Sequence, residues 1–286
     1  MYQGALPPAI GPLAQALAGH DVIVVVGAPV FRYYPYVPGE YLPAGAELFH
    51  ITDDPSEAAR APVGTAVLAD PGRSCAVLAA TVPQATRSVP ATRPAVPPQP
   101  DGTITPEWLY HMIQAVRPTN SVIVQESLST VRQLRAQIPT DRSKSFFAMS
   151  SGVLGYGLPA AVGVAFAERD EGTNRKVICI VGDGAANYVI QAIWTAAQHN
   201  LPILFVIPRN GAYNILKSFA ELLETPGVPG LDLPGLDFVA LAKGYGCDGE
   251  RVTSSIELPD AIRRGIEFNR VHLIEVTVDA TVPPLI

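Results

Sequence analysis

Two short polar turns each follow an apolar, β-branched stretch of this chain. Gly182-Asp183-Gly184 follows residues 177–181, and Asn210 follows residues 203–207. Such stretches are typical of strands buried in a parallel sheet, whose carboxyl ends form the ligand-binding edge of open α/β folds. We therefore expect Asp183 and Asn210 to lie close together. Oxygen donors beside glycines suit a magnesium ion that carries a diphosphate.

Each turn alone also has an ordinary interpretation. Asp-Gly and Asn-Gly are common turn pairs after strands, so either one could be structural. Two such turns after successive strands, both with side chains that can bind a metal ion, favour the magnesium site over two purely structural turns. A helix after Asp183 would direct free backbone N–H groups at an anion, and glycine lets the backbone approach a phosphate closely.

Composition restricts the class of protein. The 286 residues are enough for one large or two modest domains, and 48% hydrophobic with 16% charged residues fits a buried α/β core. The net charge of −6 argues against a nucleic-acid binder. No apolar run approaches the roughly 20 residues that cross a membrane, and no signal pattern opens the chain. Three scattered cysteines indicate reduced thiols, so we expect a cytoplasmic protein without a membrane partner.

The pattern of strands and helices predicts an α/β fold with doubly wound parallel sheets. Residues 1–82 alternate short strands and helices and predict half of a Rossmann-like sheet. Residues 83–104 are a linker, with six prolines between 83 and 102. Residues 105–286 predict a second domain, with strands at 121–125, 177–181, 203–207 and 272–277 and helices at 106–116, 158–168, 188–199, 236–245 and 257–268.

Several segments resemble one enzyme family. Val181-Gly-Asp-Gly-Ala-Ala-Asn-Tyr188 and Asn210-Gly-Ala-Tyr213 are similar to the signature of thiamine diphosphate-dependent enzymes. The segments at 192–198, 228–238 and 240–246 resemble the benzoylformate decarboxylases in particular. The resemblance extends from Tyr2 to the carboxyl terminus. It covers the later part of that family's central domain and all of its diphosphate-binding domain.

The resemblance implies a set of cofactor contacts. Asp183, Asn210 and the Ala212 carbonyl would bind Mg²⁺. Ala185 stands where a serine is usual, so only its backbone N–H remains for the phosphate. The other residues implied to contact thiamine diphosphate are Ser129, Gly182, Gly184 and Tyr213.

Two further residues would act on the cofactor's shape. The Gly152 carbonyl would accept a hydrogen bond from the aminopyrimidine, and Leu154 would hold the cofactor bent. Bending brings the amino group against the reactive carbon. Without the resemblance, Leu154 is simply a core residue and Ser129 is a loop or cap residue.

Departures from the family concern the substrate. Tyr34 stands where a histidine is a proposed proton donor, and a phenol with a pKa of about 10 is a poorer proton shuttle at neutral pH. Leu128 replaces a threonine, and Ile215 replaces a small pocket residue. Leu216 and Phe219 keep the pocket apolar. Together these changes argue against benzoylformate as the substrate and against plain decarboxylation, and Tyr34 favours attack on a second carbonyl.

The expected function is that of a thiamine diphosphate-dependent 2-keto acid decarboxylase or carboligase, with a small 2-keto acid as substrate. The family's catalytic glutamate belongs to a pyrimidine-binding domain that this sequence does not contain. We expect another chain to supply it, unless the sequence is a fragment of a longer protein. An alternative is a non-catalytic cofactor-binding or assembly subunit. A nicotinamide dehydrogenase is disfavoured, because no Gly-x-Gly-x-x-Gly turn opens a strand–helix unit.

Overall fold

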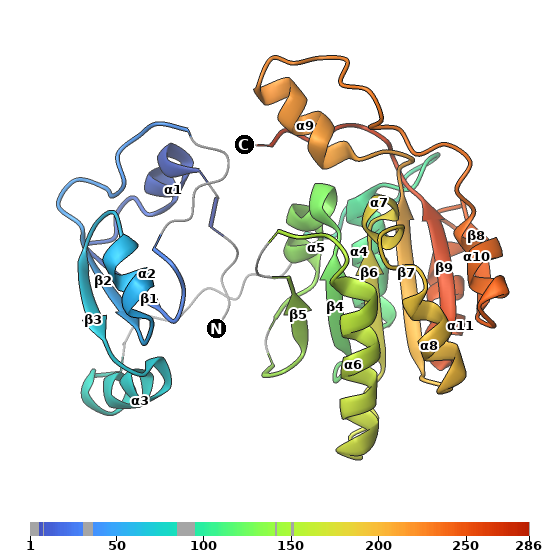
Figure 1. The fold of residues 1–286 in the computed structure, drawn as a ribbon, viewed down its shortest axis with the longest axis horizontal. Helices are drawn as coiled ribbons and strands as arrows, with labels where there is room; N and C mark the ends of the chain where they lie inside the picture. Colours follow the sequence, from blue (N-terminus) through green and yellow to red (C-terminus); the bar gives the residue numbers. More distant parts are fainter. Residues whose placement is uncertain are drawn as a thin grey trace. The chain divides into compact units, whose positions relative to one another are not determined.

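The computed structural model describes residues 6–7, 9–30, 37–84, 95–140, 142–149 and 152–285. The chain divides into two compact units, one at residues 5–92 and one at residues 93–285. Both are built from parallel strands joined by helices (Figure 1).

The smaller unit has a three-stranded parallel sheet in the order β1-β2-β3. Two of its helices begin at Asp-Pro pairs, where an aspartate caps the first turn. Asp54 Oδ1 accepts from Ser56 N at 2.7 Å, and Asp70 Oδ1 accepts from Arg73 N at 2.7 Å. The elements are α1 (Ile10–Ala16), β1 (Val22–Val26), β2 (Glu47–Thr52), α2 (Pro55–Arg60), β3 (Thr65–Leu68) and α3 (Pro71–Thr81).

The larger unit has a six-stranded, all-parallel sheet in the order β5-β4-β6-β7-β9-β8. Its strands are β4 (Val122–Glu126), β5 (Phe146–Ala148), β6 (Val177–Val181), β7 (Ile203–Arg209), β8 (Asp248–Val252) and β9 (His272–Thr277). β6 and residues 203–208 of β7, at the centre of the sheet, are buried, which explains their continuous apolar sequences.

Helices cover both faces of this sheet. One apolar cluster joins the sheet to α6 (Gly157–Asp170), α8 (Ala192–Gln198) and α10 (Phe238–Gly244). A second cluster joins the other face to α4 (Pro106–Val116), α5 (Val131–Gln137) and α11 (Leu258–Glu267). The expected α/β class with doubly wound parallel sheets is confirmed.

Some elements differ from the sequence expectations. The helix expected at 188–199 starts only at Ala192, because residues 187–191 form turns and a bend between it and α7 (Asp183–Ala186). β7 continues past residue 207 through Pro208. Pairing of β7 with β6 ends at Val206, so only β9 pairs with the strand at Pro208, a position like that of an edge strand where proline is tolerated. α9 (Asn214–Leu222), a 3-10 turn η1 (Leu128–Thr130), and α1, α5, β5 and β8 were not expected.

Candidate functional site

The two polar turns lie at the carboxyl ends of neighbouring strands. β6 and β7 pair in parallel, with Ile180 opposite Val206, so the chain after each strand emerges at the same edge. The Gly211 N–H donates to Asp183 Oδ2 at 2.7 Å. The Asp183 carboxylate therefore contacts the loop that carries Asn210.

Asp183 is a buried carboxylate, with 3% of its surface exposed. Burial raises its pKa, although backbone N–H donors from Gly211 and Gly184 and the charge of Arg209 act in the opposite direction. Within the described residues it makes no salt bridge. A buried anion held only by neutral donors is a favourable place for a cation, and its oxygens together with the amide oxygen of Asn210 suit Mg²⁺.

The loop at 210–213 has a defined shape. Asn210 Oδ1 accepts from the Ala212 N–H at 3.1 Å, and Gly211 has φ +75°, which glycine adopts freely. The Leu233 N–H donates to the Gly211 carbonyl, and the Tyr213 N–H donates to the Leu231 carbonyl, both at 2.8 Å. These bonds fasten the loop to the 231–233 segment.

Gly184 leaves room for an aromatic ring. A Cβ at this position would lie 2.5 Å from Tyr213 Cε1, so the tyrosine ring lies directly against the glycine. Burial raises the pKa of the Tyr213 phenol. Ala185 follows and is buried, while Gly182 is partly exposed. Any larger residue at 184 would push the ring away.

Leu128 and Ser129 lie on η1, directly after β4, and both are half-buried. A cluster of hydroxyl groups fixes this turn. Tyr110 on α4 is buried and hydrogen-bonds to Ser127 and Thr130, whose own hydroxyls are 2.8 Å apart. Burial raises the pKa of Tyr110 to about 12. Sequence reasoning missed this cluster, because Tyr110 reads as part of the apolar stripe of α4.

Gly152 and Leu154 lie just before α6. Gly152 is exposed and has φ +75°, while Leu154 is half-buried and packs against the core. The partner of this segment is Glu126 at the end of β4, which no local sequence pattern indicates. Glu126 is fully buried and accepts from the Gly155 N–H at 2.7 Å and the Gly157 N–H at 2.6 Å.

The residues expected in the substrate pocket come from two segments that meet. α9 carries Ile215, Leu216 and Phe219 and contacts η1, which carries Leu128. Ile215 and Phe219 are half-buried, whereas Leu216 is 47% exposed. Tyr34 lies outside the described residues.

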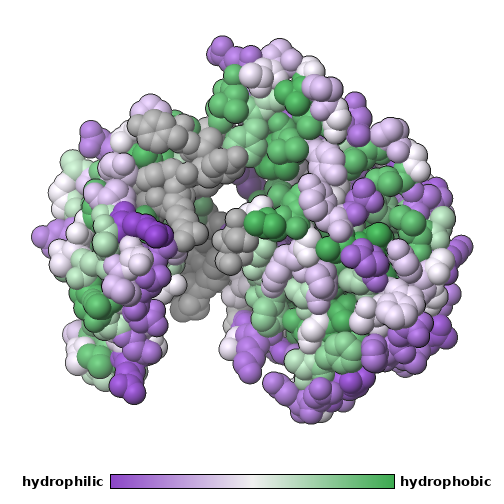
Figure 2. Space-filling view, in the orientation of Figure 1, coloured by the Kyte–Doolittle hydropathy of each residue, from purple (hydrophilic) through white to green (hydrophobic). Residues whose placement is uncertain are grey.

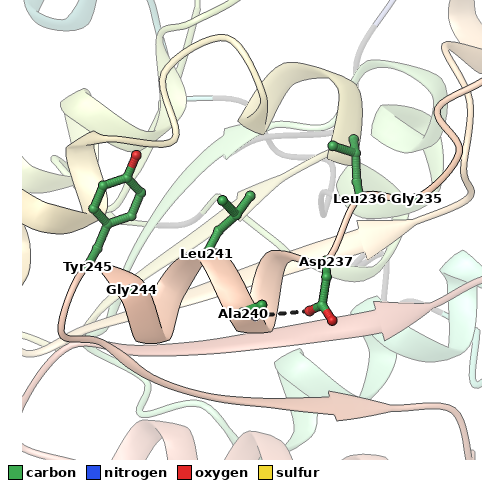
Figure 3. Close-up of a pocket in the computed structure, with 7 residues that line it drawn as sticks. All are labelled: Gly235, Leu236, Asp237, Ala240, Leu241, Gly244 and Tyr245. Atoms are coloured by element: carbon green, nitrogen blue, oxygen red, sulfur yellow. Dashed lines mark hydrogen bonds between the residues drawn. The ribbon is translucent and has the colours of Figure 1, made fainter.

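A surface hollow of about 510 Å³ lies elsewhere, along α10 (Figure 3). It is lined by Gly235, Leu236, Asp237, Ala240, Leu241, Gly244 and Tyr245. None of the expected site residues lines it. The Asp237 carboxylate in this lining already caps α10 by accepting from Ala240 N at 2.9 Å, and it forms an ion pair with Arg251 at 3.0 Å.

The side chains of the described residues limit how a metal could be held. No group of three or more His, Cys, Asp or Glu side chains in that part of the chain could hold a metal ion. A metal here would thus need amide and carbonyl oxygens beside Asp183. No helix within those residues is long and apolar enough to cross a membrane.

Comparison with known proteins gives consistent results. Residues 129–276 match the family described as thiamine pyrophosphate enzyme, C-terminal TPP binding domain. The chain is 43% identical over 284 residues to benzoylformate decarboxylase of Pseudomonas aeruginosa, covering 99% of this chain and 53% of the relative. It is 33% identical over 300 residues to a putative acetolactate synthase large subunit of Mycobacterium tuberculosis, covering 99% of this chain and 55% of the relative.

A solved structure is also similar. The thiamine diphosphate-dependent 4-hydroxybenzoylformate decarboxylase of Rhodococcus jostii RHA1 superposes with a TM-score of 0.92 at 41% identity. That match covers 98% of this chain and 53% of the other. The chain spans about half the length of the curated relatives it matches.

Proposed function

Because the chain belongs to the thiamine pyrophosphate enzyme family, we propose that it is the diphosphate-binding part of a thiamine diphosphate-dependent 2-keto acid decarboxylase or carboligase. When bound, thiamine diphosphate accepts the electron pair released as the substrate loses carbon dioxide. The residues described here bind and orient that cofactor.

In this proposal Asp183 and Asn210 bind Mg²⁺ through side-chain oxygens, and Ala212 binds it through its carbonyl. The backbone from Gly182 to Ala185 would hold the diphosphate, together with the Ser129 hydroxyl and Tyr213. The Gly152 carbonyl and the Leu154 side chain would orient the pyrimidine.

The hydrogen bond from Gly211 N to Asp183 Oδ2 is the observation that supports this proposal most. It joins residues 28 positions apart and leaves a buried carboxylate against the backbone of the loop that carries Asn210. Isothermal titration of the full chain with thiamine diphosphate and Mg²⁺ tests it. We expect binding by the wild type and none by Asp183→Ala. Asp232→Ala removes an exposed carboxylate from the neighbouring loop and should bind normally. Equal binding by all three proteins would refute the proposal.

The substrate we propose is a small 2-keto acid. Leu128, Ile215, Leu216 and Phe219 would form an apolar wall where α9 meets η1. Tyr34 would stand near the reacting carbon in place of a histidine and would favour attack on a second carbonyl. Product analysis by chromatography tests this. Tyr34→His should raise the ratio of aldehyde to coupled product, and an unchanged ratio would remove the role of Tyr34.

We also propose that another chain supplies the pyrimidine-binding domain and its catalytic glutamate. The small sheet exposes apolar residues that a partner could cover: Val22 and Val24 on β1 are 51% and 48% exposed, and Leu68 on β3 is 62% exposed. Figure 2 also shows hydrophobic side chains at the surface around α9, where Leu216 and Leu223 are exposed. Sedimentation of the purified chain tests whether it needs such a partner. A stable monomer would contradict it.

A non-catalytic cofactor-binding or assembly subunit is the second candidate. Ala185 favours it, because a buried methyl group stands where the family has a phosphate-binding hydroxyl. Turnover of a panel of 2-keto acids, measured with the partner present, separates the two. Cofactor binding without turnover of any of them would favour the second candidate.

A further inference from the structure

Glu126 lies where three segments of the proposed cofactor site meet. It is the last residue of β4, its side chain is fully buried, and η1, which carries Leu128 and Ser129, begins two residues later. Its carboxylate accepts from Gly155 and Gly157, which follow the segment with Gly152. Its own carbonyl accepts from the Gly182 N–H at 3.1 Å, at the start of the Asp183 turn.

The two carboxylate bonds are short and use different oxygens. The Gly155 N–H reaches Oε1 at 2.7 Å, and the Gly157 N–H reaches Oε2 at 2.6 Å. Hydrogen bonds to an ionised carboxylate are stronger than those between neutral groups, and burial excludes water as a competitor. The segment before α6 is therefore held to the end of β4 by an acceptor pair that only a carboxylate of this length provides.

The backbone on the other side of Glu126 is also fixed. Ser127 donates its N–H to Gln125 Oε1 at 3.1 Å, and its hydroxyl belongs to the cluster with Tyr110 and Thr130. The neighbouring space is filled as well, because a Cβ on Gly157 would lie 3.0 Å from Glu126 Cβ. A change in the carboxylate therefore moves the Gly152–Gly157 segment, since the β4 end cannot shift to follow it.

We propose that Glu126 is a positioning residue that sets the distance between the two parts of the site that would hold the two ends of the cofactor. It would do so by holding the Gly152–Leu154 segment in fixed relation to Ser129 and Asp183. This inference rests on the proposed function of the site. Glu126 itself need not touch the cofactor.

Three variants of the full chain test the proposal. Glu126→Gln keeps the size of the side chain but has one acceptor oxygen, so one of the two N–H groups faces an NH₂ group. Glu126→Asp keeps the charge but is one methylene shorter. Glu168→Gln is the control: this carboxylate is also buried on α6, but it pairs with Arg175 at the far end of the helix.

Hydrogen–deuterium exchange without cofactor is the first measurement. In Glu126→Gln we expect exchange at residues 152–158 to rise about tenfold or more, because a charge-assisted bond to a buried donor is lost. Glu168→Gln should leave this segment protected. Unchanged exchange at 152–158 in both Glu126 variants would overturn the proposal.

Titration with thiamine diphosphate and Mg²⁺ is the second measurement. We expect the dissociation constant to rise about tenfold in Glu126→Gln and Glu126→Asp and to stay at the wild-type value in Glu168→Gln. Wild-type affinity in the Glu126 variants would overturn the positioning role while leaving the proposed function intact. If the wild type itself binds no cofactor, the proposed function fails, and the positioning role fails with it.

Discussion

Replacing Gly157 by alanine tests the packing at the first turn of α6. A Cβ there would lie 2.6 Å from Val181 Cγ2, 3.0 Å from Glu126 Cβ and 3.1 Å from Glu126 Oε2. Real Cβ atoms do not approach other atoms as closely as 2.6 Å, so a neighbour must move. Val181 is fully buried in the last position of β6, and Glu126 is held by two hydrogen bonds, so neither has free space.

The expected cost follows from overpacking. An extra methyl group in a filled core destabilises a protein by about 1–3 kcal/mol, from which a gain in helix propensity of up to about 1 kcal/mol is subtracted. We therefore expect Gly157→Ala to lower the free energy of unfolding by roughly 1–2 kcal/mol. In a unit of this size that corresponds to a fall in Tm of roughly 2–8 °C.

Gly163→Ala is the matched control on the same helix. Gly163 is exposed, and a Cβ there would meet nothing within 4 Å. Only the helix-propensity gain remains, so this variant should be more stable than the wild type by about 0.5–1 kcal/mol. Urea unfolding followed by circular dichroism measures both. Equal stabilities for the two variants would refute the packing argument.

Three other predictions concern buried polar groups. Burial raises the pKa of Asp183 above its unfolded value, so its contribution to stability is present at low pH and is lost as pH rises through the folded pKa. In urea unfolding with EDTA, the free energy of unfolding of Asp183→Asn should therefore rise relative to that of the wild type as pH rises. A difference between the two proteins that stays constant with pH would contradict this. Tyr110→Phe removes the hydroxyl that binds Ser127 and Thr130 and should cost about 1–3 kcal/mol by urea unfolding; a change below about 0.5 kcal/mol would show that the cluster is dispensable. Glu275 is fully buried and accepts from Arg251 Nε at 2.8 Å and Phe238 N at 3.1 Å. Glu275→Ala should cost about 2 kcal/mol or more, below the full penalty for a buried pair because Arg251 is 41% exposed; a neutral result in a calorimetric scan would contradict the ion-pair account.

Local pattern was enough to predict the buried strands of the larger sheet. β6 is a continuous apolar run, β7 is apolar from Ile203 to Ile207, and β4 begins with Val122-Ile123-Val124, because parallel strands covered by helices on both faces bury these side chains. β8 was missed because Asp248–Val252 is an edge strand whose polar residues do not read as a strand. α9 was missed because it starts just after an Asn-Gly turn, where sequence favours a loop.

In the candidate site, too, the parts marked by a local sequence pattern could be predicted and the contacts between distant residues could not. The ends of β6 and β7 could be placed from sequence because each is marked by a local turn. The Glu126 contacts with Gly155 and Gly157 join residues 29 and 31 positions apart, and no periodicity encodes such a pairing. The hydroxyl cluster under η1 likewise depends on α4 packing beside α5, a tertiary contact that a linear pattern does not specify.

A crystal structure of the full chain grown with thiamine diphosphate and Mg²⁺ tests the central claim most directly. The account predicts one metal ion bound by Asp183, Asn210 and the Ala212 carbonyl, with metal–oxygen distances of about 2.0–2.1 Å. Bound cofactor whose metal contacts neither Asp183 nor Asn210 would contradict it.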